Sequence, residues 1–189
     1  MHLVAFDPGK NNFAFAVLIE GKCRAHGHIR TVTDLHYNNV RDELVRFGHD
    51  VDKVLTRHTQ WLAFERMQHR PRMGGGGVVE YINLMIGICM EKALRRHARL
   101  YPVASGTWKS AMRKRFGVDK DRFCMATQKI AIRQPPGSKP KTRTQLVEGV
   151  LAGQPGAAEL SPHEGDAIGI GCYVWRQLTG IDIVSTVLT

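Results

Sequence analysis

Two short stretches near the start of the chain decide the fold. Residues Leu3–Gly9 read LVAFDPG, and residues Phe13–Ile19 read FAFAVLI. The first stretch is an apolar run that ends in Asp-Pro-Gly, a pattern typical of a buried strand followed by a turn. The second stretch is apolar throughout and ends just before Gly21, which predicts a second strand with a defined end. The chain therefore opens with two strands of a sheet.

The remaining apolar patterns alternate between helices and strands. Val40, Leu44, Phe47, Val51 and Val54 are spaced by threes and fours, which predicts an amphipathic helix that packs on the sheet. Together these patterns predict a single α/β domain over residues 1–189, with a central five-stranded mixed sheet flanked by helices. The other expected elements are strands at 23–31, 61–64 and 100–104, helices at 78–99, 105–116 (capped by Ser105) and 119–133, a loop at 134–143, and two closing helices.

The positive charge of the chain is concentrated in one segment. The 189 residues carry 27 Lys and Arg against 17 Asp and Glu, a net charge of +10. Residues 92–143 hold 15 of the basic groups and two of the acidic ones, whereas residues 1–91 have a net charge of +1 and residues 144–189 a net charge of −4. A surface kept soluble by charge usually mixes both signs, so the segment 92–143 predicts a phosphate-binding surface.

Five basic side chains of this segment are candidates for DNA binding. The apolar positions of the helix at 105–116 leave its basic residues on the outer face. Nucleic acid is the partner that such a cluster favours. The candidates are Lys109, Arg113, Lys114, Arg115 and Lys120.

Two carboxylates stand at the ends of apolar strands. Asp7 follows the first strand, and Glu65 follows the strand at 61–64. If these strands are neighbours, about 4.8 Å apart, the two carboxylates can share a divalent cation, which offsets their repulsion. Asp7 alone is better explained as a turn former, but Glu is not a usual turn residue.

The last helix opens with residues Ser161–Asp166, which read SPHEGD. Ser at the cap, Pro at the first helical position and Glu164 three residues after the cap predict a capping box. His163 and Asp166 are three apart and project from one face of the first turn. The helix dipole by itself also favours Asp166. Three glycines between residues 165 and 171 indicate close packing on the sheet, which places this turn over the strand ends.

Asp7, Glu65, His163 and Asp166 are therefore candidate metal ligands and catalytic residues. Three carboxylates and one imidazole suit Mg²⁺ or Mn²⁺ better than structural zinc. Two such ions clamp the attacking and leaving oxygens in phosphodiester hydrolysis. Beside a phosphate-binding segment, this set predicts a nuclease that uses two metal ions per active site and no small-molecule cofactor.

Other classes of protein are disfavoured by what the sequence lacks. The four cysteines contain no Cys-x-x-Cys pair, so neither a zinc site nor a disulfide framework is predicted. The most apolar stretch, residues 81–90, is ten residues long, whereas a membrane span needs about 20. The first residues resemble neither a signal nor a transit peptide. We expect a cytoplasmic protein that does not bind membranes.

Short motifs occur in a fixed order along nearly the whole chain. They are Phe6-Asp7-Pro8-Gly9, Phe64-Glu65, the glycine-containing loop with the long helix, Trp108-Lys109, Asp119-Lys120 and His163-Glu164-Gly165-Asp166. With these motifs the chain resembles the RuvC family of Holliday-junction resolvases, a branch of the RNase H-like superfamily. The resemblance implies an RNase H-like fold, a homodimer, and paired symmetric nicking of four-way DNA junctions with Mg²⁺ or Mn²⁺. This is the reaction of a crossover junction endodeoxyribonuclease in DNA recombination and repair.

The resemblance also implies roles for single residues. The metal-binding carboxylates of the family match Asp7, Glu65 and Asp166. A fourth ligand, which is Asp in some members and His in others, matches His163. Two family lysines near the scissile strand match Lys109 and Lys120.

The chain departs from the family pattern after Glu65. Well-known members carry there an aromatic residue that wedges into the junction, whereas residues 66–69 read RMQH and precede a longer glycine-rich loop. Met67 and Met73 are candidates for the wedge.

Two other functions and one residue pair stay open. The first alternative is an RNase H-like nuclease for RNA–DNA hybrids or flaps, and the second is a branched-DNA-binding protein that does not cleave. The complete ligand set argues against the second. His26 and His28 occupy alternate positions of a strand and have no assigned role.

Overall fold

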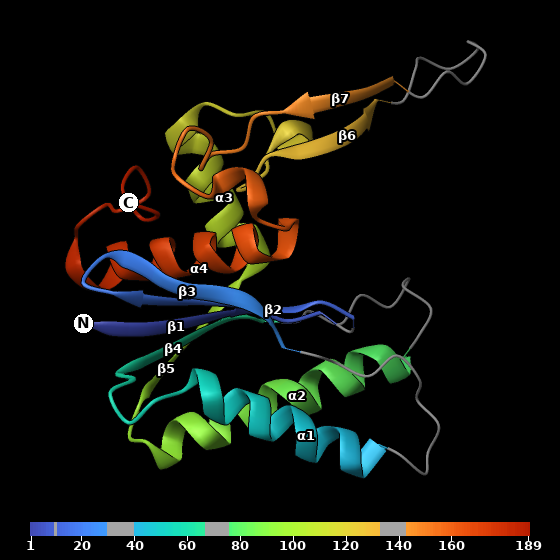
Figure 1. The fold of residues 1–189 in the computed structure, drawn as a ribbon, viewed down its shortest axis with the longest axis vertical. Coiled ribbons are helices and arrows are strands. Elements are labelled where there is room, and N and C mark those ends of the chain that lie inside the picture. Colours follow the sequence, from blue (N-terminus) through green and yellow to red (C-terminus); the bar gives the residue numbers. More distant parts are fainter. Residues whose placement is uncertain (10, 30–39, 67–75, 133–142) are drawn as a thin grey trace.

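The computed structural model describes residues 1–9, 11–29, 40–66, 76–132 and 143–189. A five-stranded sheet in the order β3-β2-β1-β4-β5 forms its centre (Figure 1). β1 pairs antiparallel with β2 and parallel with β4, so the sheet is mixed, as predicted. The strands are β1 (His2–Asp7), β2 (Phe13–Ile19), β3 (Lys22–Ile29), β4 (Trp61–Arg66) and β5 (Arg99–Ala104).

Helices cover both faces of the sheet. Figure 1 shows α4 and α3 on one side and α1 and α2 on the other. α4 packs on β1, β2 and β4, while α2 packs on β4 and β5. These layers confirm the predicted α/β class and the five-stranded mixed sheet flanked by helices. The helices are α1 (Val40–Val54), α2 (Gly76–Arg95), α3 (Ser105–Phe116) and α4 (Pro162–Thr179).

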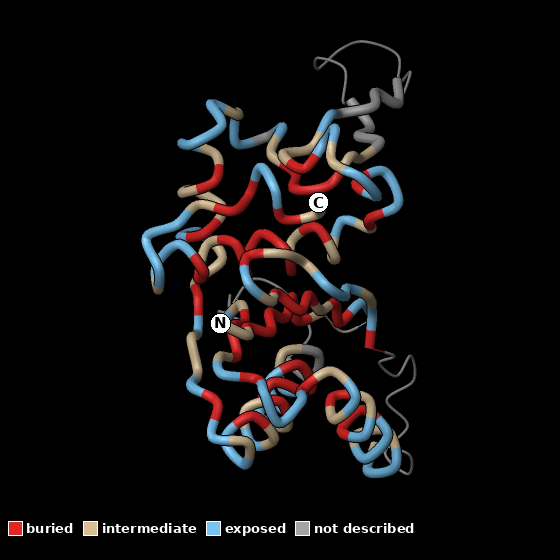
Figure 2. The backbone as a smooth tube through the Cα atoms, turned by 60° about the vertical axis from the view of Figure 1, so that its left-hand side comes forward, coloured by how far each residue is buried: buried red, intermediate tan, exposed pale blue. Residues whose placement is uncertain are grey.

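The first strand is buried on both faces. Leu3 and Ala5 belong to the core under α4, and Val4 and Phe6 belong to the core under α1 and α2. A strand sandwiched in this way needs apolar residues at every position, which explains the unbroken run at 3–6. Figure 2 shows the buried stretches running through the middle of the molecule, with exposed residues on its outside.

The two helices under the sheet differ slightly from the prediction. Phe47 and Val51 of α1 are buried, which confirms the amphipathic stripe. α2 ends at Arg95, four residues earlier than expected. A capping turn ends it, because the N–H of Ala98 bonds to the carbonyl of Ala93 (3.0 Å) and His97 adopts a φ of 60°. No helix in the described ranges has both the length and the hydropathy to cross a membrane.

The basic helix predicted at residues 119–133 is wrong. A single 3₁₀ turn, η1 (Lys120–Arg122), is followed by the strand β6 (Gln128–Ile132), which pairs antiparallel with β7 (Arg143–Val147). The branched residues of β6 favour a strand once a partner strand is available, and the basic residues beside them obscured this pattern. The expected loop lies outside the described residues except for Arg143, which begins β7.

The closing helices and their caps are partly as predicted. One of the two is only a 3₁₀ turn, η2 (Ala157–Glu159), and the other is α4. The cap expected at Ser105 is wrong, because α3 begins at Ser105 itself and Ala104 occupies the cap position. The capping box of α4 is confirmed: Ser161 Oγ accepts from the Glu164 N–H (3.2 Å), and Glu164 Oε2 accepts from the Ser161 N–H (2.9 Å).

The glycines of α4 let it approach its neighbours closely. A Cβ at Gly171 would lie 2.8 Å from the side chain of Leu18 in β2, and a Cβ at Gly169 would lie 2.7 Å from the ring of Trp108 in α3. Larger residues at these positions would push α4 away from the sheet and from α3. The close packing predicted from these glycines is therefore confirmed.

Candidate active site

Asp7 is the last residue of β1, and Glu65 is the last but one of the neighbouring parallel strand β4. Phe6 of β1 pairs with Phe64 of β4, so the next residue in each strand is a carboxylate. Side chains alternate along a strand, which puts both carboxylates on the face that α4 covers. Asp7 is 9% exposed. The chain therefore holds two carboxylates side by side at one end of the sheet.

The first turn of α4 places His163 against Asp7. Nδ1 of His163 lies 2.8 Å from Oδ2 of Asp7. This hydrogen bond raises the pKa of His163 above its ordinary value, and the charges of Asp7 and Asp166 add to the effect against partial burial and Lys109. The imidazole is consequently more often protonated near neutral pH than a free histidine, and it balances part of the negative charge of Asp7.

α3 contributes two further contacts to the carboxylates. Nε1 of Trp108 donates a hydrogen bond to Oε2 of Glu65 (2.8 Å), and Nζ of Lys109 donates one to Oδ2 of Asp166 (2.8 Å). Trp108 is fully buried, so it fixes one oxygen of Glu65 at the edge of the core. Each of the three carboxylates thus has a nitrogen partner from a helix above the sheet.

The groups of this site interact electrostatically as one set. The pKa of Asp166 is raised to about 6: burial is the largest cause, the charges of Asp7 and Glu65 add to it, and Lys109 opposes it. Burial lowers the pKa of the Lys109 amine, but Asp166, Glu65 and Asp7 outweigh burial and raise it. Three acids therefore surround one ammonium group.

The donor chemistry of this set fits a divalent metal ion. Carboxylate oxygens and one imidazole are suitable ligands for Mg²⁺ or Mn²⁺, and three acids gathered around the Lys109 ammonium already favour a cation. Within the described ranges, no group of three His, Cys, Asp or Glu side chains stands assembled at ligating positions. Contacts to Lys109, Trp108 and His163 orient the carboxylates in this state, so binding of a metal requires these side chains to turn.

His26 and His28 of β3 reach the same turn of α4. His26 Nδ1 lies 2.8 Å from Glu164 Oε1, and His28 Nε2 lies 2.8 Å from Ser161 Oγ. The ring of His28 also meets the ring of His163 edge-on, with centroids 6.5 Å apart. The pair left open by the sequence thus braces the capping box that positions His163.

The other basic candidates differ in their surroundings, and the pairing of Arg115 with Asp182 places it toward the opposite end of α4 from His163 and Asp166. Lys114 and Lys120 are exposed. Arg115 forms an ion pair with Asp182 and lies over the ring of Phe116. Arg113 is half-buried, and its Nε has no hydrogen-bond partner among the residues that the structure describes. Met67 and Met73, the candidates for a wedge, lie outside the described residues.

Comparison with known proteins identifies the fold. No protein-family model matches the chain, and no curated protein matches it in sequence. The structure is similar to that of RuvC from Thermus thermophilus, with a TM-score of 0.62, 15% identity, and coverage of 96% of this chain and 98% of that chain. The complex of T. thermophilus RuvC with a Holliday junction substrate gives a TM-score of 0.58, 14% identity, and coverage of 95% and 96%. YeaZ from Pseudomonas aeruginosa gives a TM-score of 0.43, 14% identity, and coverage of 100% and 98%. The chain has the RNase H-like fold.

Sequence reasoning missed the contacts that orient the carboxylates. Trp108 matches the apolar face of α3, but its indole N–H bonds to Glu65, 43 positions earlier in the chain. No local sequence pattern predicts a hydrogen bond between residues so far apart in the chain. The one available signal was a Trp-Lys pair placed early in a helix that follows a strand, because both residues then lie near the strand ends.

Proposed function

We propose that the protein is a structure-selective DNA endonuclease that resolves four-way junctions by paired symmetric nicking. The observation that carries this proposal is the convergence of Asp7, Glu65 and Asp166, with His163 and Lys109, at one end of the sheet. A protein that only coats DNA has no use for three acids in a region that faces phosphates. The proposed nuclease is one domain that spans residues 1–189.

Asp7, Glu65 and Asp166, together with His163, would hold Mg²⁺ or Mn²⁺, with two ions per active site. When bound, the ions supply charge neutralisation at the phosphate and a lowered pKa for the attacking water. The set suits these ions because hard oxygen ligands dominate it.

The other side chains of the site orient and balance this set. Trp108 holds one oxygen of Glu65 in place, so the carboxylate presents its second oxygen to the site. Lys109 lies among the acids in the free protein and is near enough to the strand ends to pair with a DNA phosphate. His163, held by Asp7, places a nitrogen beside the same carboxylate.

Branched DNA is the proposed substrate, and a homodimer is the proposed active form. Lys114 and Lys120 are exposed and supply positive charge that a DNA backbone can contact. The fold is shared with a RuvC structure solved with a Holliday junction substrate, which motivates the choice of DNA. Symmetric cutting needs two sites related by a twofold axis. Leu84 and Leu94 of α2 are 52% and 55% exposed, so this helix offers an apolar face for a second copy.

The experiment that tests the proposal is cleavage of synthetic substrates by the purified protein in Mg²⁺. A four-way junction, an RNA–DNA hybrid, a flap and a linear duplex are labelled on each strand in turn, and the cut positions are mapped. We expect paired cuts on two opposed strands of the junction and little cleavage of the other three substrates. If the hybrid or the flap is cut faster than the junction, that nucleic acid is the substrate and the junction proposal is wrong. If no substrate is cut, the nuclease proposal is wrong.

A further inference from the structure

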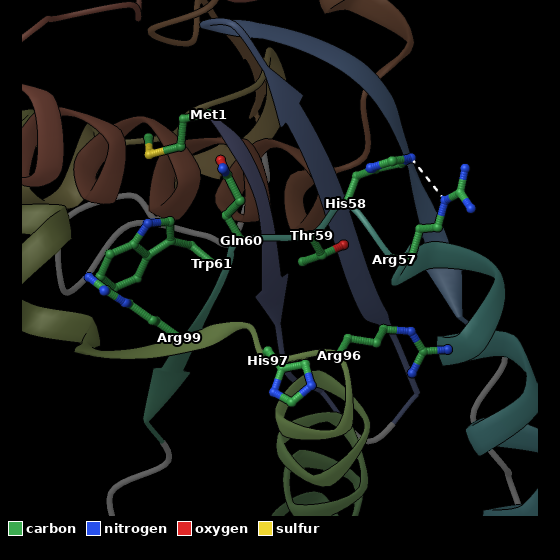
Figure 3. A pocket seen from close by; sticks show the side chains of 9 residues that line it. All are labelled: Met1, Arg57, His58, Thr59, Gln60, Trp61, Arg96, His97 and Arg99. Atoms are coloured by element: carbon green, nitrogen blue, oxygen red, sulfur yellow. Dashed lines mark hydrogen bonds between the residues drawn. The ribbon is translucent and has the colours of Figure 1, made fainter.

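A second polar pocket lies at the opposite end of the sheet. It is formed by the chain start, the loop between α1 and β4, and the turn between α2 and β5 (Figure 3). β1, β4 and β5 all begin here, whereas Asp7 and Glu65 stand at the other ends of their strands. Five residue steps along β1 amount to roughly 17 Å, so the pocket is separate from the candidate active site.

The pocket is lined by cationic and polar side chains. Five of its nine lining residues are Arg or His, and none is Asp or Glu. Figure 3 shows Trp61 and Arg99 on one side of the pocket, Arg57, His58 and Arg96 on the other, and His97 between them. The five are Arg57, His58, Arg96, His97 and Arg99.

Few carboxylates balance these cations. Asp52 accepts from Arg96 Nη2 (2.8 Å), but its other oxygen accepts from Lys92 (2.5 Å). Among the described residues, Arg57 and Arg99 form no ion pair: Arg57 donates from Nε to His58 Nε2 (3.2 Å), and Arg99 lies over the ring of Trp61 (5.5 Å). Burial lowers the pKa of the neighbouring His2, and His58 and the chain amino group lower it further, as expected in a positive field.

The walls of the pocket are fixed by hydrogen bonds. In the loop before β4, the N–H of Thr56 bonds to Oγ1 of Thr59 (3.1 Å), and the N–H of Thr59 bonds to the carbonyl of Thr56 (3.1 Å). The N–H of Arg99 bonds to the carbonyl of Gln60 (2.9 Å), which joins the two loops. The cationic groups are therefore carried by a rigid frame, and a ligand need not order it.

His97 occupies a backbone position that favours glycine. Its φ of 60° is left-handed, and it follows the last turn of α2 where a capping glycine is usual. A side chain there strains the backbone, because its Cβ crowds the chain. The chain nevertheless places an imidazole at this position, inside the pocket.

We propose that this pocket binds a nucleotide phosphate group, carried on a DNA strand or free. Guanidinium groups present paired N–H donors that match phosphate oxygens. Trp61, half-buried beside Arg99, offers an aromatic surface on which a base can stack. The site uses no residue of the candidate active site, so it goes beyond the proposed nuclease function.

Tryptophan fluorescence measures this binding directly. Trp108 and Trp175 are 0% and 6% exposed, so Trp61 is the tryptophan in a position to respond. The protein is titrated in EDTA with inorganic phosphate, with thymidine 5′-monophosphate and with a short oligo(dT) strand. We expect a saturable change that Trp61→Phe abolishes. Tighter binding of the strand assigns the phosphate to DNA, and equal binding of all three probes assigns it to a free anion; both results support the pocket.

Three variants and one control separate the pocket from general charge. Arg57→Ala and Arg99→Ala should each weaken binding about tenfold and reduce the salt slope for the strand by about 0.7. His97→Gly should weaken binding while leaving the melting temperature equal or higher, because glycine suits this backbone. Arg95→Ala removes the same charge from an exposed residue that pairs with Glu91 outside the pocket, and it should change binding less than twofold.

The proposal is overturned if Trp61 responds to none of the three probes, or if Arg95→Ala weakens binding as much as Arg57→Ala. Since the titration contains neither metal nor cleavage, its outcome is independent of the nuclease proposal.

Discussion

The two ends of the central sheet carry opposite charge. Acids gather at the carboxyl ends of β1 and β4, where Lys109 and His163 balance them. At the amino ends, arginines and histidines line a pocket without a carboxylate. The net charge of +10 predicts neither arrangement. What differs is the ligand that each end suits, because divalent cations select carboxylates and phosphates select guanidinium groups.

The central sheet supports both ends. Apart from Asp7, the buried positions of β1, β2 and β4 are apolar and hold the loops and helix ends at positions roughly 17 Å apart. The polar groups of the candidate active site lie at the ends of β1 and β4 and in the first turns of α3 and α4. The predictions below test whether the acidic end behaves as a cation site, from the largest expected effect to the smallest.

Replacing Asp7 should have the largest effect. Asp7→Asn keeps the shape of the side chain but removes the charge that, in our proposal, holds the metal. We expect the rate of junction cleavage in Mg²⁺ to fall at least about 1000-fold, while junction binding in Ca²⁺ stays within a few-fold. Asp50→Asn removes a carboxylate from the surface of α1, where it pairs with Lys53, and should cleave like the wild type. An active Asp7→Asn protein would sink the catalytic assignment.

Lys109→Ala should reduce the rate of junction cleavage by about 10–100-fold. Lys109 donates to Asp166 and lies near the strand ends, so its loss leaves the acids without their cation and the phosphate without a partner. The slope of binding against salt should become shallower by about 0.9 on duplex arms. Lys53→Ala on α1 is the matched control. An unchanged slope would show that Lys109 contacts no phosphate.

The acidic end should destabilise the metal-free protein. The pKa of Asp166 is raised from 3.8 to about 6, so the folded protein keeps a proton that the unfolded chain releases in this window. The free energy of unfolding attributable to Asp166 therefore falls as pH rises from 3.8 to 6, and the deficit persists above pH 6.

Asn cannot ionise, so Asp166→Asn should be more stable than the wild type at neutral pH by about 1–3 kcal/mol. Urea denaturation in EDTA across the pH range measures this difference. If Asp166→Asn is less stable than the wild type at neutral pH, the ionised Asp166 carboxylate does not destabilise the fold.

The contacts of His26 and Ser161 with Glu164 should have the smallest effect, which is on the stability of the fold at acid pH. Burial opposes the shift, but the bonds from His26 and Ser161 bring the pKa of Glu164 from 4.5 to about 2. A lowered carboxylate pKa stabilises the fold above pH 4.5, and this contribution is lost as pH falls toward 2. Glu164→Gln should flatten acid unfolding in that window, and Ser161→Ala should cost about 1 kcal/mol.

Glu159→Gln, in the exposed turn η2, is the control for Glu164→Gln. If both glutamines change the acid unfolding curve equally, the bonds from His26 and Ser161 have no specific effect on stability.

Local sequence patterns account for most of the sheet and for α4. The run at 3–6 is apolar because β1 is covered on both faces, and SPHEGD contains every group of the capping box within four residues. The failure at 119–133 has the opposite cause. β6 is stabilised by pairing with β7, which begins 11 residues after β6 ends, so no single window contains both strands.

The sites themselves were predictable only in part. The candidate ligands of the acidic end lie at strand ends and at a helix start, which are visible in the sequence. Their partners are not, since Lys109 and Asp166 are 57 positions apart. The basic pocket was missed altogether, because its residues come from three separate segments and no local pattern links them.

The central claim is that the acidic end of the sheet holds a divalent cation. Titration with Mn²⁺, followed by the electron paramagnetic resonance signal of the free ion, tests it without DNA or catalysis. The account predicts saturable binding to the wild type and to Asp50→Asn, and binding at least about tenfold weaker in Asp7→Asn. Equal binding by the wild type and Asp7→Asn, or no saturable binding by either, would contradict it.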